Sequence, residues 1–328
     1  MRLSYIIPVY NSSKWLERCL HSLLNQGIPT DDYEIIAVDD GSTDDSPIVL
    51  DELKTELSKK NVSVHVVRQE NAGASAARNV GLRIAKGNYI WWIDGDDFLE
   101  VDSASQFLSI CEEHKLDILH FGCKIVYADG RVLDYPIEKD NAGIVFPGEE
   151  YIIRYGFPPN VWSALYRRAF LQEKNLQLKE GVVHEDLEFP PRAFCLAERV
   201  ASVPVLAYCY YQTENSVMRT KDVKKIKKKT FDLLDICDSL YRFVENRNYD
   251  RCSAVRTVFI NHISFSFSQS LRNYSTDLFD VVKFTEKPYY PLEINDNLSK
   301  KDKIKYLLIN FSLPLYLFFL RLIKKCRK

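Results

Sequence analysis

Short apolar runs alternate with segments of helical periodicity along the first hundred residues. The apolar runs are short, β-branched and aromatic, and they fall at residues 2–10, 33–38, 62–68 and 89–93. Between them, residues 14–26 and 46–59 place apolar side chains three and four positions apart, and a third helix opens near residues 71–79. This alternation predicts an α/β fold with a doubly wound, mostly parallel sheet flanked by helices.

The pattern changes after residue 100. Asp129-Gly130 lies between two apolar runs, which is a hairpin signal. The further predicted elements are a helix at 103–114, strands at 116–127 and 132–135, a loop at 136–150 and an edge strand at 207–211. Beyond residue 215 the chain is basic and helical, with predicted helices at 222–246 and about 250–273. We therefore expect one domain at 1–220 and a helical appendage at 221–328.

Composition narrows the class of protein. The chain has 328 residues, 46% hydrophobic, and a formal net charge of -1, so no general affinity for nucleic acid is expected. The 8 cysteines are scattered singly, without a CxxC pair, which argues against structural zinc and for a reducing compartment. The N-terminus lacks the pattern of a signal peptide. A cytoplasmic location is the expectation.

The last segment, residues 300–328, is both apolar and basic. Residues 306–323 are apolar and aromatic but include Pro314, and lysines and arginine flank them on both sides. A spanning helix needs about 20 apolar residues. A basic segment of this kind favours attachment in the interface of the inner leaflet, on the cytoplasmic face of the membrane. A packed helix, in the core or in a homodimer, and a spanning helix stay as alternatives.

Carboxylates follow two of the predicted strands. Asp94-Gly95-Asp96-Asp97 comes directly after residues 89–93, and Asp39-Asp40 follows residues 33–38. The carboxyl ends of parallel strands meet at one edge of a sheet, where ligands bind. Clustered carboxylates there suit Mg²⁺ or Mn²⁺. An aspartate-rich turn that caps the next helix is the alternative for Asp94–Asp97.

Two further acidic positions have alternative interpretations. Asp40 is a candidate to accept a hydrogen bond from a base or sugar, or to cap a helix over 44–58. Glu185 and Asp186, preceded by His184, are candidates for a general base, or for the acidic first turn of a helix. The chain contains no GxxxxGK[ST], GxGxxG or GxSxG motif, so a P-loop enzyme is excluded and a dinucleotide enzyme is disfavoured.

Five blocks in order resemble the family 2 glycosyltransferases of the GT-A fold, over roughly residues 1–215. The blocks are Tyr5–Asn11, Ala37–Asp44, Asn71–Asn79, Gly87–Asp97 with its DXD motif, and His184–Asp186. The resemblance implies an inverting, metal-dependent transfer from a nucleotide-diphosphate sugar, expected to be a UDP-sugar. It implies nucleotide-sugar binding by residues 1–100 and acceptor binding by residues 101–220.

The resemblance also implies roles for individual residues. Pro8, Tyr10 and Asp40 would line the nucleotide pocket, with Asp40 facing the base. Asp94 would lie near the ribose or phosphates, Asp96 would bind Mn²⁺ or Mg²⁺, and Arg78 would approach the nucleotide, with Ser75 and Asn79 as weaker candidates. Asp186 would be the general base and Glu185 would orient it. Trp162 and His184 would lie on the acceptor side.

The expected function is addition of a sugar to a glycan or lipid-linked acceptor in bacterial surface polysaccharide assembly. The QxxRW motif of processive members is absent from the sequence, which favours one sugar per encounter. A nucleotidyltransferase acting on sugar phosphates and a non-catalytic nucleotide-sugar binding module are the alternatives. The first lacks the expected phosphate loop after the first strand, and the second does not explain why all three acidic positions are present.

Overall fold

A computed structural model describes residues 1–137, 143–212, 222–250, 253–273, 284–313 and 316. Contacts divide the chain into two compact units. The first unit comprises Met1–Gly181 and Phe189–Ser216, and the second comprises Val182–Glu188 and Val217–Lys328. Each unit is described by itself.

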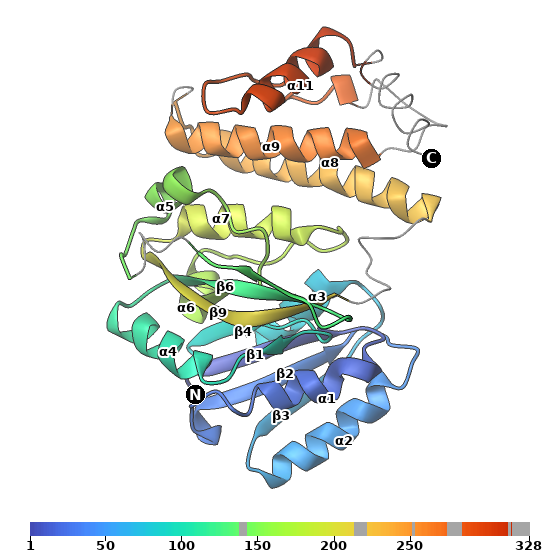
Figure 1. Cartoon of the computed structure of the whole chain (residues 1–328), viewed down its shortest axis with the longest axis vertical. Helices are drawn as coiled ribbons and strands as arrows, with labels where there is room; N and C mark the ends of the chain where they lie inside the picture. Colours follow the sequence, from blue (N-terminus) through green and yellow to red (C-terminus); the bar gives the residue numbers. More distant parts are fainter. Residues whose placement is uncertain (138–142, 213–221, 251–252, 274–283, 314–315, 317–328) are drawn as a thin grey trace. The chain divides into compact units, whose positions relative to one another are not determined.

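The first four strands are parallel, as the alternating pattern predicts. Strands β1 (Leu3–Val9), β2 (Tyr33–Asp39), β3 (Ser63–Arg68) and β4 (Tyr89–Trp92) lie in the order β3-β2-β1-β4. Helices α1 (Ser13–Ser22), α2 (Ser46–Lys59) and α3 (Ala74–Ile84) connect them (Figure 1). The predicted strand–helix alternation is confirmed.

The sheet continues beyond β4 with mixed pairing. Strand β8 (Ala164–Arg167) is antiparallel to β4, and β6 (Ile118–Tyr127), β9 (Val200–Gln212) and β5 (Phe98–Leu99) follow it. The predicted hairpin is confirmed, because β7 (Val132–Tyr135) pairs with β6. The described strands therefore form one mixed sheet, parallel in its first half.

Two sequence predictions in this half are wrong. Residues 207–211 do not form an edge strand, since they belong to the longer β9, which lies between β6 and β5. Residues 136–150 are not all loop, because helix α5 (Gly148–Tyr155) begins at Gly148. Both elements are stabilised by contacts with distant parts of the chain. Gly148 donates its N–H to the Ala197 carbonyl, and β9 pairs with β6 along its length.

Helices cover both faces of the sheet. On one face, α1, α2 and α4 (Ser103–Glu113) share a core with β1, β2 and β4. Trp91 belongs to this face and packs against Tyr5 and Phe107. Its neighbour Trp92 lies on the opposite face, against Tyr166 and Phe189, the first residue of α7 (Phe189–Leu196). Burial on both faces explains why the β4 sequence is apolar throughout rather than alternating.

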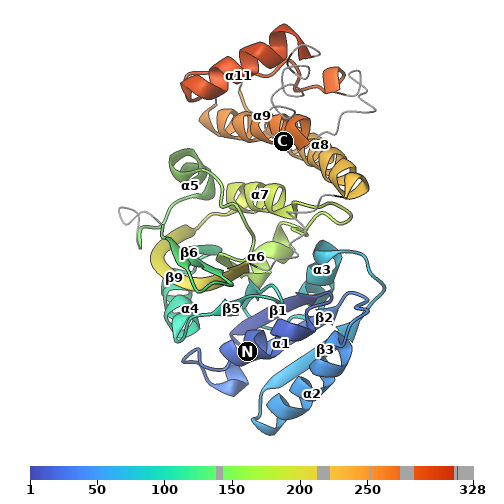
Figure 2. The same cartoon turned by 45° about the vertical axis from the view of Figure 1, so that its right-hand side comes forward.

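The second unit is built mainly from helices. The long helices α8 (Val223–Glu245) and α9 (Ala254–Asn273) confirm the two helices predicted after residue 215, and they lie side by side in both views (Figures 1 and 2). Residues 182–188 belong to this unit and contain a 3₁₀ turn, Glu185–Leu187. Helix α11 spans Lys300–Phe311. Residues 314–315 and 317–328 of the predicted membrane segment lie outside the described residues.

Within the described residues, every helix is either too short or too polar to cross a lipid bilayer.

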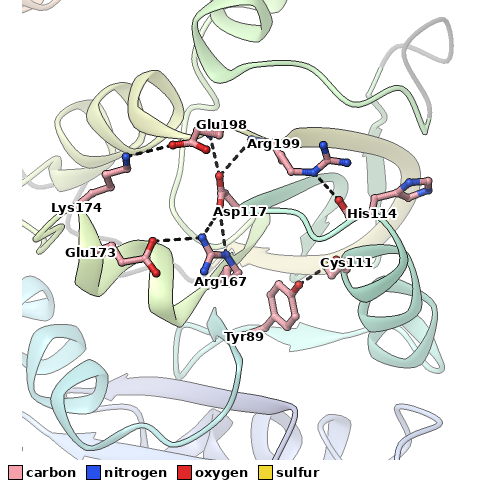
Figure 3. Close-up of polar contacts among 9 residues, drawn as sticks. All are labelled: Tyr89, Cys111, His114, Asp117, Arg167, Glu173, Lys174, Glu198 and Arg199. Atoms are coloured by element: carbon pink, nitrogen blue, oxygen red, sulfur yellow. Dashed lines mark hydrogen bonds and ion pairs between the residues drawn. The ribbon is translucent and has the colours of Figure 1, made fainter.

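A charged cluster lies at the opposite end of β4 from its carboxylates. Asp117 accepts two bonds from Arg167 at 2.7 and 3.0 Å, and it accepts the backbone N–H groups of Glu198 and Arg199 (Figure 3). The cluster lines a cavity of about 540 Å³ that also contacts Tyr89, where β4 begins. Asp117, which precedes β6, thus joins the last residue of β8 to the two residues that precede β9.

We expect Asp117→Asn to lower the free energy of unfolding by about 2–4 kcal/mol, because it removes the charge of a carboxylate that is only 6% exposed and replaces one of its two acceptor oxygens by an NH₂ group. Glu198→Gln is the matched control. Its carboxylate is 80% exposed and pairs with Lys174 at 3.5 Å, so its loss should cost no more than about 0.5 kcal/mol. Urea unfolding of both variants measures the difference, and equal effects would contradict the structural role of Asp117.

Candidate active site

The carboxyl ends of β1, β2 and β4 bring several predicted site residues to one edge of the sheet. The Asp40 N–H donates to the Val9 carbonyl at 2.8 Å, and the Ile93 N–H donates to the Ile6 carbonyl at 3.0 Å. Pro8, Tyr10, Asp40 and Asp94 therefore lie at adjacent strand ends. Tyr10 is 51% exposed, and its ring is accessible to a ligand.

Arg78 links the α3 block to the carboxylates that follow β4. Its guanidinium donates to Asp94 at 2.5 Å, with the Arg78 side chain 4% exposed and that of Asp94 27% exposed. The nearby Asn79 contacts a different part of the chain, since its amide bonds Leu178 and Glu180. Ser75 is buried. Arg78 is thus the member of this block that meets the acidic strand ends.

The three carboxylates after β4 have different environments. Asp97 points into the protein, where it accepts the Tyr208 hydroxyl at 2.6 Å and the Tyr211 N–H at 2.7 Å. Burial, and then the charges of Asp96 and Asp94, hold the pKa of Asp97 well above its ordinary value. The same Tyr208 oxygen accepts the Asp94 N–H at 3.0 Å. Asp97 and Tyr208 therefore fix the turn that carries Asp94 and Asp96.

Asp94 forms an ion pair and Asp97 is fully buried. Asp96 has neither feature among the described residues. Burial, followed by repulsion from Asp94, raises the pKa of Asp96 to about 6. Arg18 approaches the same residue through its backbone, donating to the Asp96 carbonyl at 2.7 Å. The Arg18 guanidinium also lies over the rings of Phe98 and Tyr211. Burial and the charge of Asp94 thus outweigh the attraction of Arg18 at Asp96.

The residues present fit a divalent cation that is only partly coordinated by protein. Mg²⁺ and Mn²⁺ take one or two carboxylates and complete their shell with water and phosphate oxygens. Asp96 supplies such a carboxylate, with hard oxygen donors. The described residues contain no cluster of three or more histidine, cysteine or acidic side chains suited to a metal, so a site complete within the protein is not seen there.

Asp40 is buried and engaged by the loop that precedes α3. Its two carboxylate oxygens accept the N–H groups of Ala72 and Gly73, each at 2.8 Å, and the Gln69 amide at 2.7 Å. It does not cap the helix over 44–58, because α2 has Asp45 as its N-cap and Asp44 accepts the Ser46 N–H. A carboxylate has about four acceptor positions, and three of them are filled here, with the residue 2% exposed.

Trp162 is packed beside the acidic turn. Its ring stacks on Tyr208 at 4.2 Å between centroids and on Tyr210 at 6.0 Å, with interplanar angles of 14° and 10°. Since Tyr208 also binds Asp97 and the Asp94 backbone, Trp162 belongs to the same packed group. It is 8% exposed, so little of its ring is free for sugar stacking.

His184, Glu185 and Asp186 lie in the second unit, on a segment that α8 and α9 hold. The Val183 N–H donates to Asp232 at 2.8 Å, the Ser239 hydroxyl donates to Glu188 at 2.7 Å, and His262 donates its Nε2–H to the Leu187 carbonyl at 2.8 Å. Glu185 and Asp186 form the 3₁₀ turn ahead of α7, close to the predicted alternative of an acidic helix start. Both side chains are half-buried.

His184 adopts a left-handed backbone conformation, with φ of 79° and ψ of 38°. A non-glycine residue takes this conformation rarely, and such residues gather at turns and functional sites. Burial, and then Lys229, lower the pKa of His184, which favours a neutral imidazole. The convergence of this segment with the strand-end carboxylates stays a prediction.

Three residues of the first unit's site were missed from the sequence: Arg18, Asp97 as an anchor, and Tyr208. Arg18 occupies an ordinary position of an amphipathic helix, and Tyr208 lies in a strand that is rich in tyrosine. Neither position carries a local pattern. Only the pairing of β9 with β5 brings Tyr208 to the turn after β4.

Comparison with known proteins identifies relatives of the first unit. The family model described as "Glycosyl transferase family 2" matches residues 4–173. The uncharacterized glycosyltransferase EpsJ of Bacillus subtilis is 32% identical over 220 residues, which are 66% of this chain and 62% of EpsJ. The poly(ribitol-phosphate) beta-N-acetylglucosaminyltransferase TarS of Staphylococcus aureus is 30% identical over 215 residues, which span 65% of this chain and 36% of TarS. The alignments thus span less than two thirds of either relative.

Solved structures share the fold. The structure of TarS 1-349 in complex with UDP-GlcNAc has a TM-score of 0.62 at 22% identity, and covers 94% of this chain and 80% of that chain. The mannosyltransferase PcManGT from Pyrobaculum calidifontis, in complex with GDP-Man and Mn²⁺, has a TM-score of 0.54 at 14% identity, and covers 98% and 86%. These likenesses confirm the GT-A fold.

We expect Asp96→Asn to stabilise the metal-free protein near neutral pH by up to about 3 kcal/mol, since it removes a carboxylate whose pKa is raised to about 6. Such a group binds its proton more readily in the folded state. Its ionisation therefore destabilises the fold progressively from about pH 4 to about pH 6. Urea unfolding with a chelator, at several pH values, measures the difference in free energy of unfolding between the variant and wild type.

This difference in free energy should be near zero below about pH 4 and should reach its plateau above about pH 6. Asp51→Asn, at an exposed carboxylate paired with Arg68, is the control and should show no such growth with pH. A difference that is independent of pH would contradict the raised pKa of Asp96.

Proposed function

This chain belongs to glycosyltransferase family 2, and on that premise we propose that it transfers a sugar from a nucleotide-diphosphate donor to an acceptor hydroxyl with inversion. One observation carries the proposal. The strand ends of β1, β2 and β4 place Tyr10, Asp40 and the Asp94–Asp97 turn at one edge of the sheet, with Arg78 bonded to Asp94. That edge supports a site for a donor with a base, a sugar and a diphosphate.

The donor we propose is a UDP-sugar. The TarS structure, which has the higher of the two TM-scores quoted above, is a complex with UDP-GlcNAc, while the PcManGT structure is a complex with GDP-Man. Asp40 remains our candidate to bind the base. Pro8, near the end of β1, and Tyr10, directly after β1, would line the nucleotide pocket. Asp94, positioned by Arg78, would lie near the ribose or the phosphates.

Asp96 would hold a divalent cation, Mn²⁺ or Mg²⁺. When bound, such a cation offsets the charge that develops on the departing diphosphate. The chain's own part is to keep the turn rigid. Tyr208 and Asp97 fix its backbone, and Arg18 holds the Asp96 carbonyl. A preorganised turn needs no rearrangement when the bond to the sugar breaks.

Asp186 is the residue we propose as general base. It would accept the proton of the acceptor hydroxyl as that oxygen attacks the anomeric carbon from the face opposite the diphosphate, so the configuration inverts. Direct displacement needs no covalent enzyme intermediate. Glu185 would orient Asp186 or the acceptor, with His184 and Trp162 on the acceptor side. The support from the second unit is that Asp232, Ser239 and His262 hold the segment that carries this base.

The acceptor we propose is a glycan or lipid-linked hydroxyl in bacterial surface polysaccharide assembly. In its support, TarS is named for a poly(ribitol-phosphate) acceptor. We propose that residues 1–220 carry the transfer reaction and that the appendage, through residues 300–328, keeps the enzyme at the cytoplasmic face of the inner membrane. A homodimer through the C-terminal helices is the competing role for that segment.

We expect UDP-sugars with Mn²⁺ to raise the melting temperature, and Asp96→Ala to abolish both the Mn²⁺-dependent part of that rise and turnover. A ligand at about a hundred times its Kd stabilises a folded protein by about 2.7 kcal/mol. A thermal-shift panel of UDP- and GDP-sugars, with Mn²⁺ or chelator, measures this. Asp31→Asn is the control, because Asp31 is exposed and lies far from the Asp94–Asp97 turn in the sequence. A rise in Asp96→Ala equal to that of wild type would refute the metal assignment.

We expect Asp186→Asn to lower kcat by at least about a hundredfold while donor binding is unchanged, since an amide cannot accept the acceptor's proton. Transfer from radiolabelled donor, together with the thermal shift by the same donor, separates the two effects. Asp232→Asn tests whether holding the segment matters, and it should lower kcat less than Asp186→Asn. A normal rate in Asp186→Asn would remove Asp186 as the base.

A further inference from the structure

Helix α11 carries apolar side chains on two opposite faces. One face is buried in the second unit through Tyr306 and Ile309, which are 1% and 0% exposed. The other face holds four large apolar side chains that are more than half exposed. These are Ile304 (60%), Leu307 (56%), Leu308 (52%) and Phe311 (83%), which we call the outer stripe.

The spacing of the outer stripe is that of an amphipathic helix. Its members stand at intervals of three, four and seven residues, so at 3.6 residues per turn they fall within an arc of about 100°. Lys303 and Lys305 border this arc, roughly 100° to either side of Ile304. Lys300 and Lys301 precede it by about one turn. The stripe is therefore enclosed by lysines along its sides and at its amino-terminal end.

The rotation of α11 is fixed by polar contacts within the second unit. The Leu292 N–H donates to the Asn310 carbonyl oxygen at 2.8 Å, and the Asn310 amide donates to the Leu292 carbonyl at 2.7 Å. At about 100° per residue Asn310 lies about 40° around the helix from Tyr306, so this reciprocal pair binds the buried side of the helix. It leaves the outer stripe turned away from Leu292.

The lysines around the stripe are available to an external anion to different degrees. Lys303 pairs with Asp296 at 3.2 Å and Lys305 with Asp302 at 2.9 Å. Lys300 and Lys301 are both exposed, and no ion pair is recorded for either among the described residues. The segment 300–311 contains four lysines and one aspartate, so its charge is positive.

We propose that the outer stripe of α11 lies in the headgroup region of an anionic lipid bilayer. Exposed leucine and phenylalanine side chains gain by leaving water, and Lys300 and Lys301, at the amino-terminal end of the stripe, extend their ammonium groups to lipid phosphates while their stems stay at the apolar boundary. A second copy of the chain would meet the stripe with the same lysines, and this like charge disfavours it. The inference rests on the proposed attachment to the membrane but not on sugar transfer.

Sedimentation of the full-length chain with lipid vesicles tests the proposal without any donor. Wild type should pellet with vesicles of phosphatidylcholine and phosphatidylglycerol, and far less with phosphatidylcholine alone. The variant Ile304→Gln/Leu307→Gln/Leu308→Gln/Phe311→Gln should bind at least about tenfold more weakly, since glutamine keeps helix propensity but removes the apolar surface. Lys300→Gln/Lys301→Gln should weaken binding to the anionic vesicles by about twenty-fivefold.

A matched control changes exposed apolar residues elsewhere. Ile48→Gln/Val101→Gln removes side chains that are 59% and 64% exposed in the first unit, and it should bind vesicles like wild type. Unchanged pelleting of the four-residue variant, or equal pelleting of wild type on neutral and anionic vesicles, overturns the proposal. So does light scattering that finds a lipid-free dimer in wild type and a monomer in the four-residue variant, since a second copy would then cover the stripe.

Discussion

Three carboxylates within four residues repel one another at the end of a buried strand, and the first unit separates them by environment. Asp97 is drawn into the interior, where a tyrosine hydroxyl and a backbone N–H bind it. Asp94 is neutralised by the buried guanidinium of Arg78. No ion pair is recorded for Asp96 among the described residues. The rest of the site depends on this division, because it leaves at a fixed place the one carboxylate that we propose as the cation ligand.

Tyr208 is central to that division. Its hydroxyl donates to Asp97 and accepts from the Asp94 backbone, and its ring stacks on Trp162. Strand β9 therefore reaches from the second half of the sheet to the turn after β4. Through this contact, the turn after the fourth parallel strand is held by residues more than a hundred positions away in the chain.

The second unit is more than a helical appendage, because it also holds residues 182–188 of the candidate site. Residues 182–188, which carry the proposed base, cluster with α8 and α9 rather than with the sheet. The bonds from Asp232, Ser239 and His262 show the cause, since they bind the backbone or the side chains on both sides of Asp186. The same unit turns an apolar, lysine-bordered stripe of α11 outward. One helical body thus holds a candidate catalytic segment and a candidate lipid surface.

The sequence by itself determined the parallel strands, the helices between them and the family. Apolar runs of strand length, such as Tyr89–Trp92, and the ordered acidic blocks are local patterns. Local patterns can be recognised in the sequence without knowledge of the fold. It also placed Asp40, Asp94 and Asp96 at strand ends, where topology alone brings them together. The tertiary structure decided what each carboxylate does, because the environment of Asp97 and Asp40 depends on Tyr208, Ala72 and Gly73. Burial and hydrogen bonding across long separations leave no periodicity in the chain, so Arg18, Tyr208 and the membership of residues 182–188 in the second unit were visible only after folding.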